Sequence, residues 1–263
     1  MDSGARIVIV LPAYNAARTL EKTYADIPRE KIAKIILVDD VSQDQTVEIA
    51  HALGLSVVIH IQNRGYGGNQ KTCYLEALKD GADVVVMLHP DHQYDSRLVP
   101  ELVAPILSGK ADMVMGSRIL NGGALKGGMP FWKYLANRVL TTAENAVYGK
   151  KLTDCHSGFR AYSRRLLTTV PFLLNSDDFV FDSQMIAQAV YLGFEIAEIP
   201  VQARYFPEAS SVNFRVSTIY GIKTAGVMLR YLLQKFGLVR SHFFDRKLPD
   251  VVSKYHHESI FRL

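Results

Sequence analysis

The chain has 263 residues, of which 48% are hydrophobic and 21% are charged, a composition that suits one large α/β domain or two small ones and excludes a disordered chain. Its two cysteines, Cys73 and Cys155, lie far apart in the sequence, which argues against a disulfide framework and favours a reducing, cytoplasmic setting. The polar residues 1–6 show no signal-peptide pattern, and no run of 18 or more uncharged apolar residues predicts a transmembrane helix.

The first half of the chain alternates short apolar runs with helix-like stretches. The predicted strands span residues 6–11, 34–38, 56–60, 84–88 and 112–115. The predicted helices between them span residues 16–27, 44–53, 68–79 and 97–107. We expect Asn15 to cap the first helix. Ser42 or Asp44 would cap the second helix, and Gly54 would end it. This alternation predicts a mostly parallel sheet with helices on both faces.

The second half of the chain is less regular. The glycine-rich residues 121–128 are typical of a mobile loop. A polar turn at residues 154–160 leads into a short strand. The other predicted elements are helices at 131–148, 182–192 and 217–236, and a strand at 195–201. We therefore expect one α/β domain over residues 1–236, ending in an amphipathic helix, followed by a basic extension over residues 237–263.

The formal net charge of +4 is unevenly distributed, with nine Lys/Arg against three Asp/Glu from Arg215 onward. A basic segment of this kind can approach an anionic membrane surface, and a solvated helix face is the alternative. Nucleic acid is not an expected partner, because the basic residues lack an interleaved aromatic platform.

Polar residues follow each of the first five predicted strands. The five segments are Pro12-Ala-Tyr-Asn15, Asp39-Asp40, Asn63-Arg-Gly-Tyr-Gly-Gly68, His89-Pro-Asp-His-Gln93 and Gly116-Ser-Arg118. A parallel sheet brings these strand ends to one edge, which predicts a ligand cleft. Asp39 and Asp40 can accept hydrogen bonds from a base or ribose, or they can cap the next helix. The turn at residues 65–68 can offer backbone N–H groups to a phosphate, although it is neither a P-loop nor a dinucleotide fingerprint.

The segment after the fourth strand carries groups that can bind a metal. Asp91 and Gln93 supply hard oxygen ligands two residues apart, which suit Mg²⁺ or Mn²⁺ bridging a diphosphate. His89 and His92 could indicate zinc instead, but a third and fourth zinc ligand are not evident.

Together these motifs resemble glycosyltransferase family 2, the inverting enzymes with the GT-A fold, over residues 6–235. The resemblance is closest to the dolichol-phosphate mannosyltransferase and polyprenyl-phosphate glycosyltransferase branch. It rests on five motifs: Val10-Leu-Pro-Ala-Tyr-Asn15, Val38-Asp-Asp-Val-Ser-Gln-Asp-Gln-Thr46, Asn63-Arg-Gly-Tyr-Gly67, Gly116-Ser-Arg118 and Asp154-Cys-His-Ser-Gly-Phe-Arg160.

The resemblance implies a role for each motif. Contacts with the nucleotide-sugar donor would come from Pro12, Tyr14, Asn15, Asp39, Asp40, Asn63, Gly67, Arg160, Arg204 and Ser211. The metal would be held by Asp91, Gln93 and His89. The catalytic and acceptor-side groups would be Asp91, Arg118, Asp154 and Asp182, with Ser157 and Arg160 lining the acceptor side.

Two departures from the family pattern bear on chemistry. His89 stands where the family usually has the first acid of Asp-Ala-Asp-x-Gln, so an uncharged imidazole replaces a carboxylate and metal dependence becomes uncertain. Lys133 and Asn137, with Arg138 adjacent, stand where the branch tends to carry Arg and then Ser for the lipid phosphate. Lysine lacks the bidentate fork of arginine, so the acceptor can differ.

The resemblance implies an enzyme that transfers a sugar from a UDP- or GDP-sugar, with inversion, to a polyprenyl or dolichyl phosphate or another glycan or lipid acceptor. A phosphate acceptor needs no general base, whereas a hydroxyl acceptor would need Asp154 or Asp182. The implied cofactor is Mg²⁺ or Mn²⁺, and the implied location is the cytoplasm or the cytoplasmic face of a membrane. The alternatives are a transferase acting on a soluble hydroxyl acceptor and a non-catalytic nucleotide-sugar-binding protein. A nucleotidyltransferase would need a glycine-rich loop after the first strand, which this chain lacks.

Overall fold

The computed structural model describes residues 4–205, 214–246 and 260–261. Its strands are β1 (Ile7–Ala13), β2 (Ile32–Asp39), β3 (Ser56–His60), β4 (Val84–Met87), β5 (Met113–Ser117), β6 (Arg160–Ser163), β7 (Ile196–Pro200) and β8 (Ile260–Phe261). Its α-helices are α1 (Leu20–Ala25), α2 (Thr46–Ala52), α3 (Gly65–Lys79), α4 (Val99–Leu107), α5 (Gly123–Lys126), α6 (Phe131–Tyr148), α7 (Arg164–Thr169), α8 (Phe181–Tyr191) and α9 (Phe214–Lys235). Short 3₁₀ turns lie at Ser96–Leu98, Leu120–Gly122, Phe172–Leu174 and His242–Phe244.

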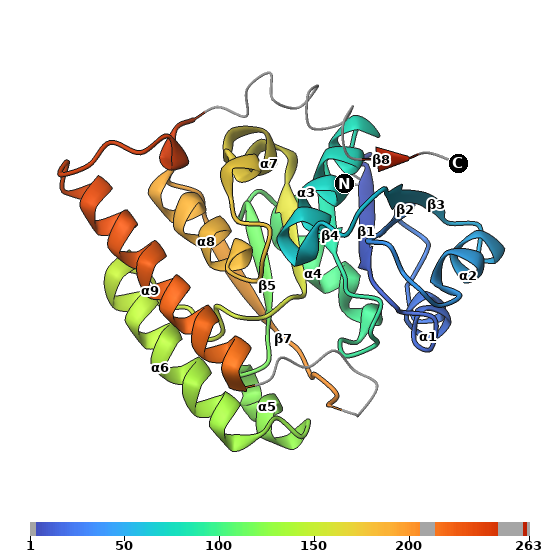
Figure 1. Cartoon of the computed structure of the whole chain (residues 1–263), viewed down its shortest axis with the longest axis horizontal. Coiled ribbons are helices and arrows are strands. Elements are labelled where there is room, and N and C mark those ends of the chain that lie inside the picture. The colour runs from blue at the N-terminus through green and yellow to red at the C-terminus, as the bar shows by residue number, and fades with distance from the viewer. Residues whose placement is uncertain (1–3, 206–213, 247–259, 262–263) are drawn as a thin grey trace.

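The strands form one mixed sheet in the order β7-β5-β6-β4-β1-β2-β3-β8 (Figure 1). The pairs β1–β2, β1–β4, β2–β3 and β5–β7 are parallel, whereas β6 lies antiparallel between β4 and β5. The predicted α/β fold with a mostly parallel sheet is therefore confirmed. The antiparallel insertion of β6 joins the two parallel halves of the sheet, so the ends of β4 and β5 lie on either side of the turn at residues 154–160.

Both faces of the sheet are buried, which explains the continuous apolar runs in the sequence. Along β1, Val8 packs into one core cluster and Ile9 into the other. The first cluster includes side chains of α3, α8 and α9, and the second includes side chains of α1, α2 and α4. The helices that close the first cluster also carry the side chains that line the large pocket described below.

Two local predictions were wrong, and two short elements were missed. Residues 121–128 form a 3₁₀ turn and α5 instead of an irregular loop, and a Cβ on Gly127 would lie 2.0 Å from the Ala203 carbonyl oxygen. Gly127 therefore permits close packing against residue 203. Asn15 caps no helix, because α1 begins only at Leu20 and the Asn15 side chain accepts from the Gln43 amide instead. The short helix α7 and strand β8 were not predicted at all.

The C-terminal part of the chain packs on the domain as far as the structure describes it. Helix α9 lies beside α6 at the side of the molecule away from α1 and α2 (Figure 1). Beyond α9, the side chains of Phe243 and Phe244 are buried in the first core cluster. None of the helices in the described ranges is both long enough and apolar enough to cross a bilayer. The rest of the predicted basic extension, residues 247–259 and 262–263, lies outside the described residues.

Candidate functional site

One large pocket of about 720 Å³ opens at the carboxyl ends of the central strands. Its wall includes residues that follow each of the first five strands, such as Tyr14, Asp40, Asn63, Asp91 and Arg118. The predicted meeting of these strand ends at one edge of the sheet is therefore confirmed. Helices α6, α8 and α9 supply the opposite wall.

The structure brings most, but not all, of the predicted site residues to this pocket. Those that line it are Pro12, Tyr14, Asn15, Asp40, Asn63, His89, Asp91, Gln93, Arg118 and Asp182. Those that lie outside its lining are Asp39, Gly67, Asp154, Ser157, Arg160 and Arg204. Ser211 lies outside the described residues.

The two aspartates at the end of β2, Asp39 and Asp40, are both buried and hydrogen-bonded within the protein. Asp39 accepts from the backbone and hydroxyl of Ser42. Asp40 accepts from His60 Nδ1 and the Arg64 amide, each at 2.7 Å, and from the Gly65 amide at 2.9 Å. A carboxylate on the first amides of α3 stabilises the helix N-terminus. Asp40 therefore stabilises the start of α3 at the edge of the pocket, whether or not it also contacts a nucleotide.

Three of the four backbone amides in the glycine-rich turn that opens α3 are hydrogen-bonded within the protein. The Gly67 and Gly68 amides both donate to the Asp177 carbonyl, at 2.8 and 3.4 Å, and the Gly65 amide donates to Asp40. A Cβ on Gly67 would lie 2.3 Å from the Ser176 carbonyl oxygen. The prediction of a phosphate-binding turn at residues 65–68 was wrong, because these glycines allow α3 to pack against residues 176–181.

The segment after β4 presents one carboxylate, one amide and one imidazole to the pocket. Asp91 Oδ1 accepts from the Gln93 amide at 3.1 Å, and burial raises the pKa of Asp91. Within the described ranges, no three acidic, histidine or cysteine side chains converge as a metal cage. Mg²⁺ and Mn²⁺ commonly bind through one or two carboxylates together with substrate phosphates. The donor set around Asp91 therefore fits a metal that the protein and a diphosphate hold jointly.

The second histidine of this segment faces away from the first. His92 Nε2 lies 3.1 Å from Arg204 Nη1, and since arginine can only donate, this nitrogen must accept. The other ring nitrogen of His92 lies 3.9 Å from Asp26 Oδ2. A zinc site built on both histidines therefore has no support.

Tyr66, which the sequence did not single out, connects the two walls of the pocket. Its hydroxyl lies 2.8 Å from Asp182 Oδ2 and 3.1 Å from His89 Nε2, and its ring stacks on the imidazole. Burial and the charge of Asp182 raise the pKa of Tyr66 well above its ordinary value, so the phenol keeps its proton. Burial lowers the pKa of His89, which favours the neutral imidazole.

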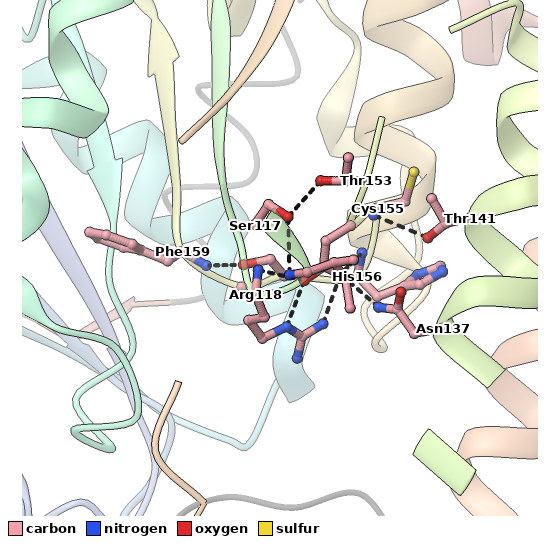
Figure 2. Close-up of polar contacts among 12 residues, drawn as sticks. Ser117, Arg118, Asn137, Thr141, Thr153, Cys155, His156 and Phe159 are labelled. Atoms are coloured by element: carbon pink, nitrogen blue, oxygen red, sulfur yellow. Dashed lines mark hydrogen bonds and ion pairs between the residues drawn. The ribbon is translucent and has the colours of Figure 1, made fainter. Parts of the chain in front are cut away.

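Arg118 and Asp154 form a bidentate ion pair at the end of β5. Figure 2 shows Arg118 and Asn137 within the surrounding polar contacts. Arg118 Nε and Nη2 lie 2.7 and 2.9 Å from the two carboxylate oxygens, and the Asn137 amide donates to the same carboxylate at 2.7 Å. Burial alone would raise the pKa of Asp154, but the charge of Arg118 and these hydrogen bonds hold it well below its usual range. Asp154 is therefore poorly suited to accept a proton from a substrate.

Arg160 is wholly buried and shapes the turn at residues 154–160. Its guanidinium donates to the carbonyl oxygens of Ser157, Cys155 and Asp182, and its Nη1 lies 3.7 Å from Asp182 Oδ1. It therefore supports Asp182 from outside the pocket lining.

The wall opposite the strand ends is cationic and apolar. Lys133 and Trp132 of α6 line it, and burial and the nearby charge of Arg118 lower the pKa of Lys133. His156 and Tyr220, both missed by the sequence analysis, complete this wall with a 2.7 Å contact between His156 Nδ1 and the Tyr220 hydroxyl. In the sequence, Tyr220 is only one residue of a predicted helix, and helical periodicity does not show whether a side chain lines a pocket or packs in the core.

Comparison with known proteins places this pocket in a known context. Residues 8–170 match the family model described as glycosyl transferase family 2. An uncharacterised protein of Methanocaldococcus jannaschii is 31% identical over 229 residues, covering 87% of this chain and 92% of that protein. The UDP-N-acetylglucosamine–dolichyl-phosphate N-acetylglucosaminyltransferase of Methanococcus voltae is 27% identical over 252 residues, covering 89% of this chain and 97% of that protein.

A solved structure extends the likeness to three dimensions. Glucosyl-3-phosphoglycerate synthase from Mycobacterium tuberculosis, in complex with Mg²⁺ and uridine diphosphate, superposes with a TM-score of 0.67 at 25% sequence identity. The match covers 87% of this chain and 79% of that one.

Proposed function

The chain belongs to glycosyl transferase family 2, and from this premise we propose that it transfers a sugar from a nucleotide-diphosphate sugar to a polyprenyl or dolichyl phosphate, with inversion. The names of the relatives support the donor and acceptor classes: one acts on UDP-N-acetylglucosamine and dolichyl phosphate, and another is named polyprenol monophosphomannose synthase. A uridine diphosphate sugar is the first donor to test, with a guanosine diphosphate sugar as the second.

This proposal rests on the hydrogen-bond partners of the carboxylates that line the described pocket. Of the three that line it, Asp40 is bonded to the start of α3 and Asp182 to Tyr66 and Gln70 Nε2. The third, Asp91, lies where the divalent metal is expected. Asp154, the other candidate base, is paired with Arg118. A hydroxyl acceptor needs a free base, whereas an ionised phosphate does not.

In the proposed reaction, a phosphate oxygen of the acceptor attacks the anomeric carbon from the side opposite the leaving diphosphate. The new bond joins the anomeric carbon to the acceptor oxygen, and the bond between that carbon and the diphosphate oxygen breaks. Lys133 would hold the acceptor phosphate by charge, and Arg118, which Asp154 neutralises, would add a hydrogen-bond donor. Asp91, with Gln93 and His89, would hold the Mg²⁺ or Mn²⁺, which when bound neutralises charge on the diphosphate. Tyr14, Asn15 and Asn63, which line the pocket, would supply the remaining contacts with the nucleotide sugar.

We also propose that helices α6 and α9 face the membrane that carries the acceptor. On α6, the exposed Phe131, Leu135 and Val139 recur every four residues, and α9 exposes Ile222 and Leu229. Apolar stripes of this kind suit an interfacial helix. They adjoin the wall that holds Lys133, so a lipid tail could lie along the helices while its phosphate enters the pocket. The cytoplasmic face of a membrane is the corresponding location.

Transfer assays test the reaction. Purified protein is incubated with UDP-N-acetylglucosamine, UDP-glucose or GDP-mannose, a divalent metal and a short polyprenyl phosphate, and products are read by mass spectrometry. We expect a glycosyl polyprenyl phosphate. Transfer only to a hydroxyl acceptor such as 3-phosphoglycerate would overturn the acceptor assignment. Donor binding without any turnover would instead support a non-catalytic nucleotide-sugar-binding protein.

Vesicle co-sedimentation tests the membrane face. We expect Leu135→Asp with Ile222→Asp to reduce binding to anionic vesicles. The matched control is Ile61→Asp with Leu174→Asp, which adds the same two charges at exposed apolar side chains outside α6 and α9. Equal losses in both proteins would contradict the assignment of α6 and α9.

A further inference from the structure

The Tyr66 hydroxyl lies between a carboxylate and an imidazole, and this position determines where the protons are. Asp182 Oδ2 is 2.8 Å from the hydroxyl oxygen, and His89 Nε2 is 3.1 Å from it. Phe179 packs on Tyr66 with a ring-centroid distance of 4.6 Å, and His89 stacks on Tyr66 at 5.3 Å. Phe179 and the imidazole of His89 therefore fix the position of the Tyr66 ring.

The direction of each hydrogen bond follows from counting protons. Asp182, ion-paired with Arg160, is a carboxylate and can only accept. Tyr66 has one hydroxyl proton, so it must donate that proton to Asp182. The phenol oxygen can then only accept from His89, which requires the proton of the neutral imidazole to sit on Nε2. The lone pair of the ring is left on Nδ1.

The Nδ1 atom is available for a ligand. The only polar contact of the ring in the described part of the chain is the one between Nε2 and Tyr66. His89 lines the pocket together with Asp91, and the two groups interact electrostatically. The ring position is also sterically fixed, because a Cβ on Gly158 would lie 2.9 Å from His89 Cδ2 and 3.0 Å from Nε2. Only a glycine at this place leaves room for the imidazole edge.

We propose that Asp182 and Tyr66 are positioning residues that hold His89 as the Nε2–H tautomer, so that Nδ1 serves as a neutral nitrogen ligand to the divalent metal beside Asp91. This inference rests on the proposed function. A histidine ligand usually donates its other N–H to a fixed partner, which sets its tautomer and orientation. Here the partner is a phenol that is itself oriented by a carboxylate.

The ligand type has a consequence for metal choice. A nitrogen ligand binds divalent transition metals such as Mn²⁺ and Co²⁺ better than it binds Mg²⁺, which is the most dependent on oxygen ligands. Exchanging a carboxylate for an imidazole also removes one negative charge from the site. The protein should therefore favour Mn²⁺ or Co²⁺ over Mg²⁺ more strongly than a site with two carboxylates would.

The first test reads the tautomer directly. Long-range ¹H–¹⁵N correlation spectra of the histidine rings, with His89 assigned by comparison with His89→Gln, report which nitrogen carries the proton. We expect Nε2–H in the wild-type protein and a mixture of tautomers in Tyr66→Phe, which keeps the stacked ring. A wild-type Nδ1–H tautomer would overturn the inference, and this reading needs neither metal nor nucleotide.

The second test measures metal affinity by Mn²⁺ paramagnetic resonance and calorimetry in the presence of UDP. Tyr66→Phe should weaken Mn²⁺ binding by about 10- to 100-fold, the usual effect of losing such a supporting hydrogen bond. Tyr24→Phe is the matched control, since the Tyr24 hydroxyl donates to the Leu53 carbonyl outside the pocket lining. His89→Asp should raise the affinity for Mg²⁺ relative to Mn²⁺.

The outcomes separate the inference from the proposed function. If the wild-type protein binds Mn²⁺ with UDP but Tyr66→Phe binds it equally well, or His89→Asp leaves the Mg²⁺ to Mn²⁺ ratio unchanged, the positioning inference is wrong. If the wild-type protein binds neither UDP nor GDP with any metal, the proposed function fails, and the spectra still decide the tautomer.

Discussion

Glu144 lies within α6 with none of its surface exposed, and replacing it with glutamine should change how stability depends on pH. One of its carboxyl oxygens is 3.3 Å from His156 Nε2. Within the described residues, neither oxygen forms a hydrogen bond of normal geometry. Burial raises the pKa of Glu144 to about 8, and burial lowers the pKa of His156 to about 4. Both groups are therefore neutral at pH 7.

The sign of the effect follows from proton binding in the two states. The folded protein keeps the Glu144 proton up to about pH 8, whereas the unfolded chain releases it near the ordinary pKa of 4.5. Between these values the folded state binds more protons, so stability falls as pH rises. The contribution is fully present below pH 4.5 and is lost as pH passes 8. At about 1.4 kcal/mol per pKa unit, the loss is at most about 5 kcal/mol.

Urea unfolding of wild type and Glu144→Gln at several pH values between 4.5 and 8.5 measures this effect. We expect the stability of the wild type relative to the variant to decline steadily across that range, because glutamine does not titrate. His156 is present in both proteins, so its own titration largely cancels. Glu48→Gln, at an exposed position of α2, is the control for a carboxyl-to-amide change. A difference between wild type and variant that does not change with pH would refute the reasoning.

Three further predictions concern other parts of the pocket. Asp40→Ala should lower the free energy of unfolding by about 3–5 kcal/mol, since two α3 amides lose a charged acceptor, and an unchanged urea midpoint would contradict this. Arg118→Lys keeps the charge but loses the bidentate contact with Asp154, so we expect a loss of about 2 kcal/mol in thermal unfolding and weaker polyprenyl phosphate binding. Gly158→Ala should displace the His89 ring and reduce calorimetric affinity for Mn²⁺ with UDP; undiminished affinity would argue against the tight fit.

The regular part of the fold was predictable because burial on both faces leaves a local signal. The predicted bounds of β3 and α6 agree with the structure, and the other strands of the first half agree to within two residues. The position of β6 was not predictable from local pattern. Its four residues pair antiparallel with both β4 and β5, and such pairing is set by partners far away in the chain. Helix α5 was not predicted for a related reason. The residue that requires glycine at position 127 is Ala203, which is far away in the sequence.

The location of the pocket was predictable, but the use of each side chain was not. A polar residue after a strand has the same local signature whether it faces a ligand or bonds to its own protein. Asp40 differs from Asp91 only because His60 and the first amides of α3 reach it. Tyr66 had no signal of its own, because its function depends on Asp182, more than one hundred residues away.

His89 stands where the family usually has an acid, and this replacement is electrostatically consistent with a phosphate acceptor. In the proposed reaction, a donor diphosphate and an acceptor phosphate approach within one pocket, and both are anionic. Each carboxylate near their meeting point adds repulsion that the metal and Lys133 must offset. Asp154 adds little, since Arg118 neutralises it, and Asp182 is paired with Arg160. A neutral imidazole beside Asp91 leaves one carboxylate, instead of two, to hold the metal. A hydroxyl acceptor without a charged group would add no such repulsion, so the charge balance of the pocket suits an ionised acceptor.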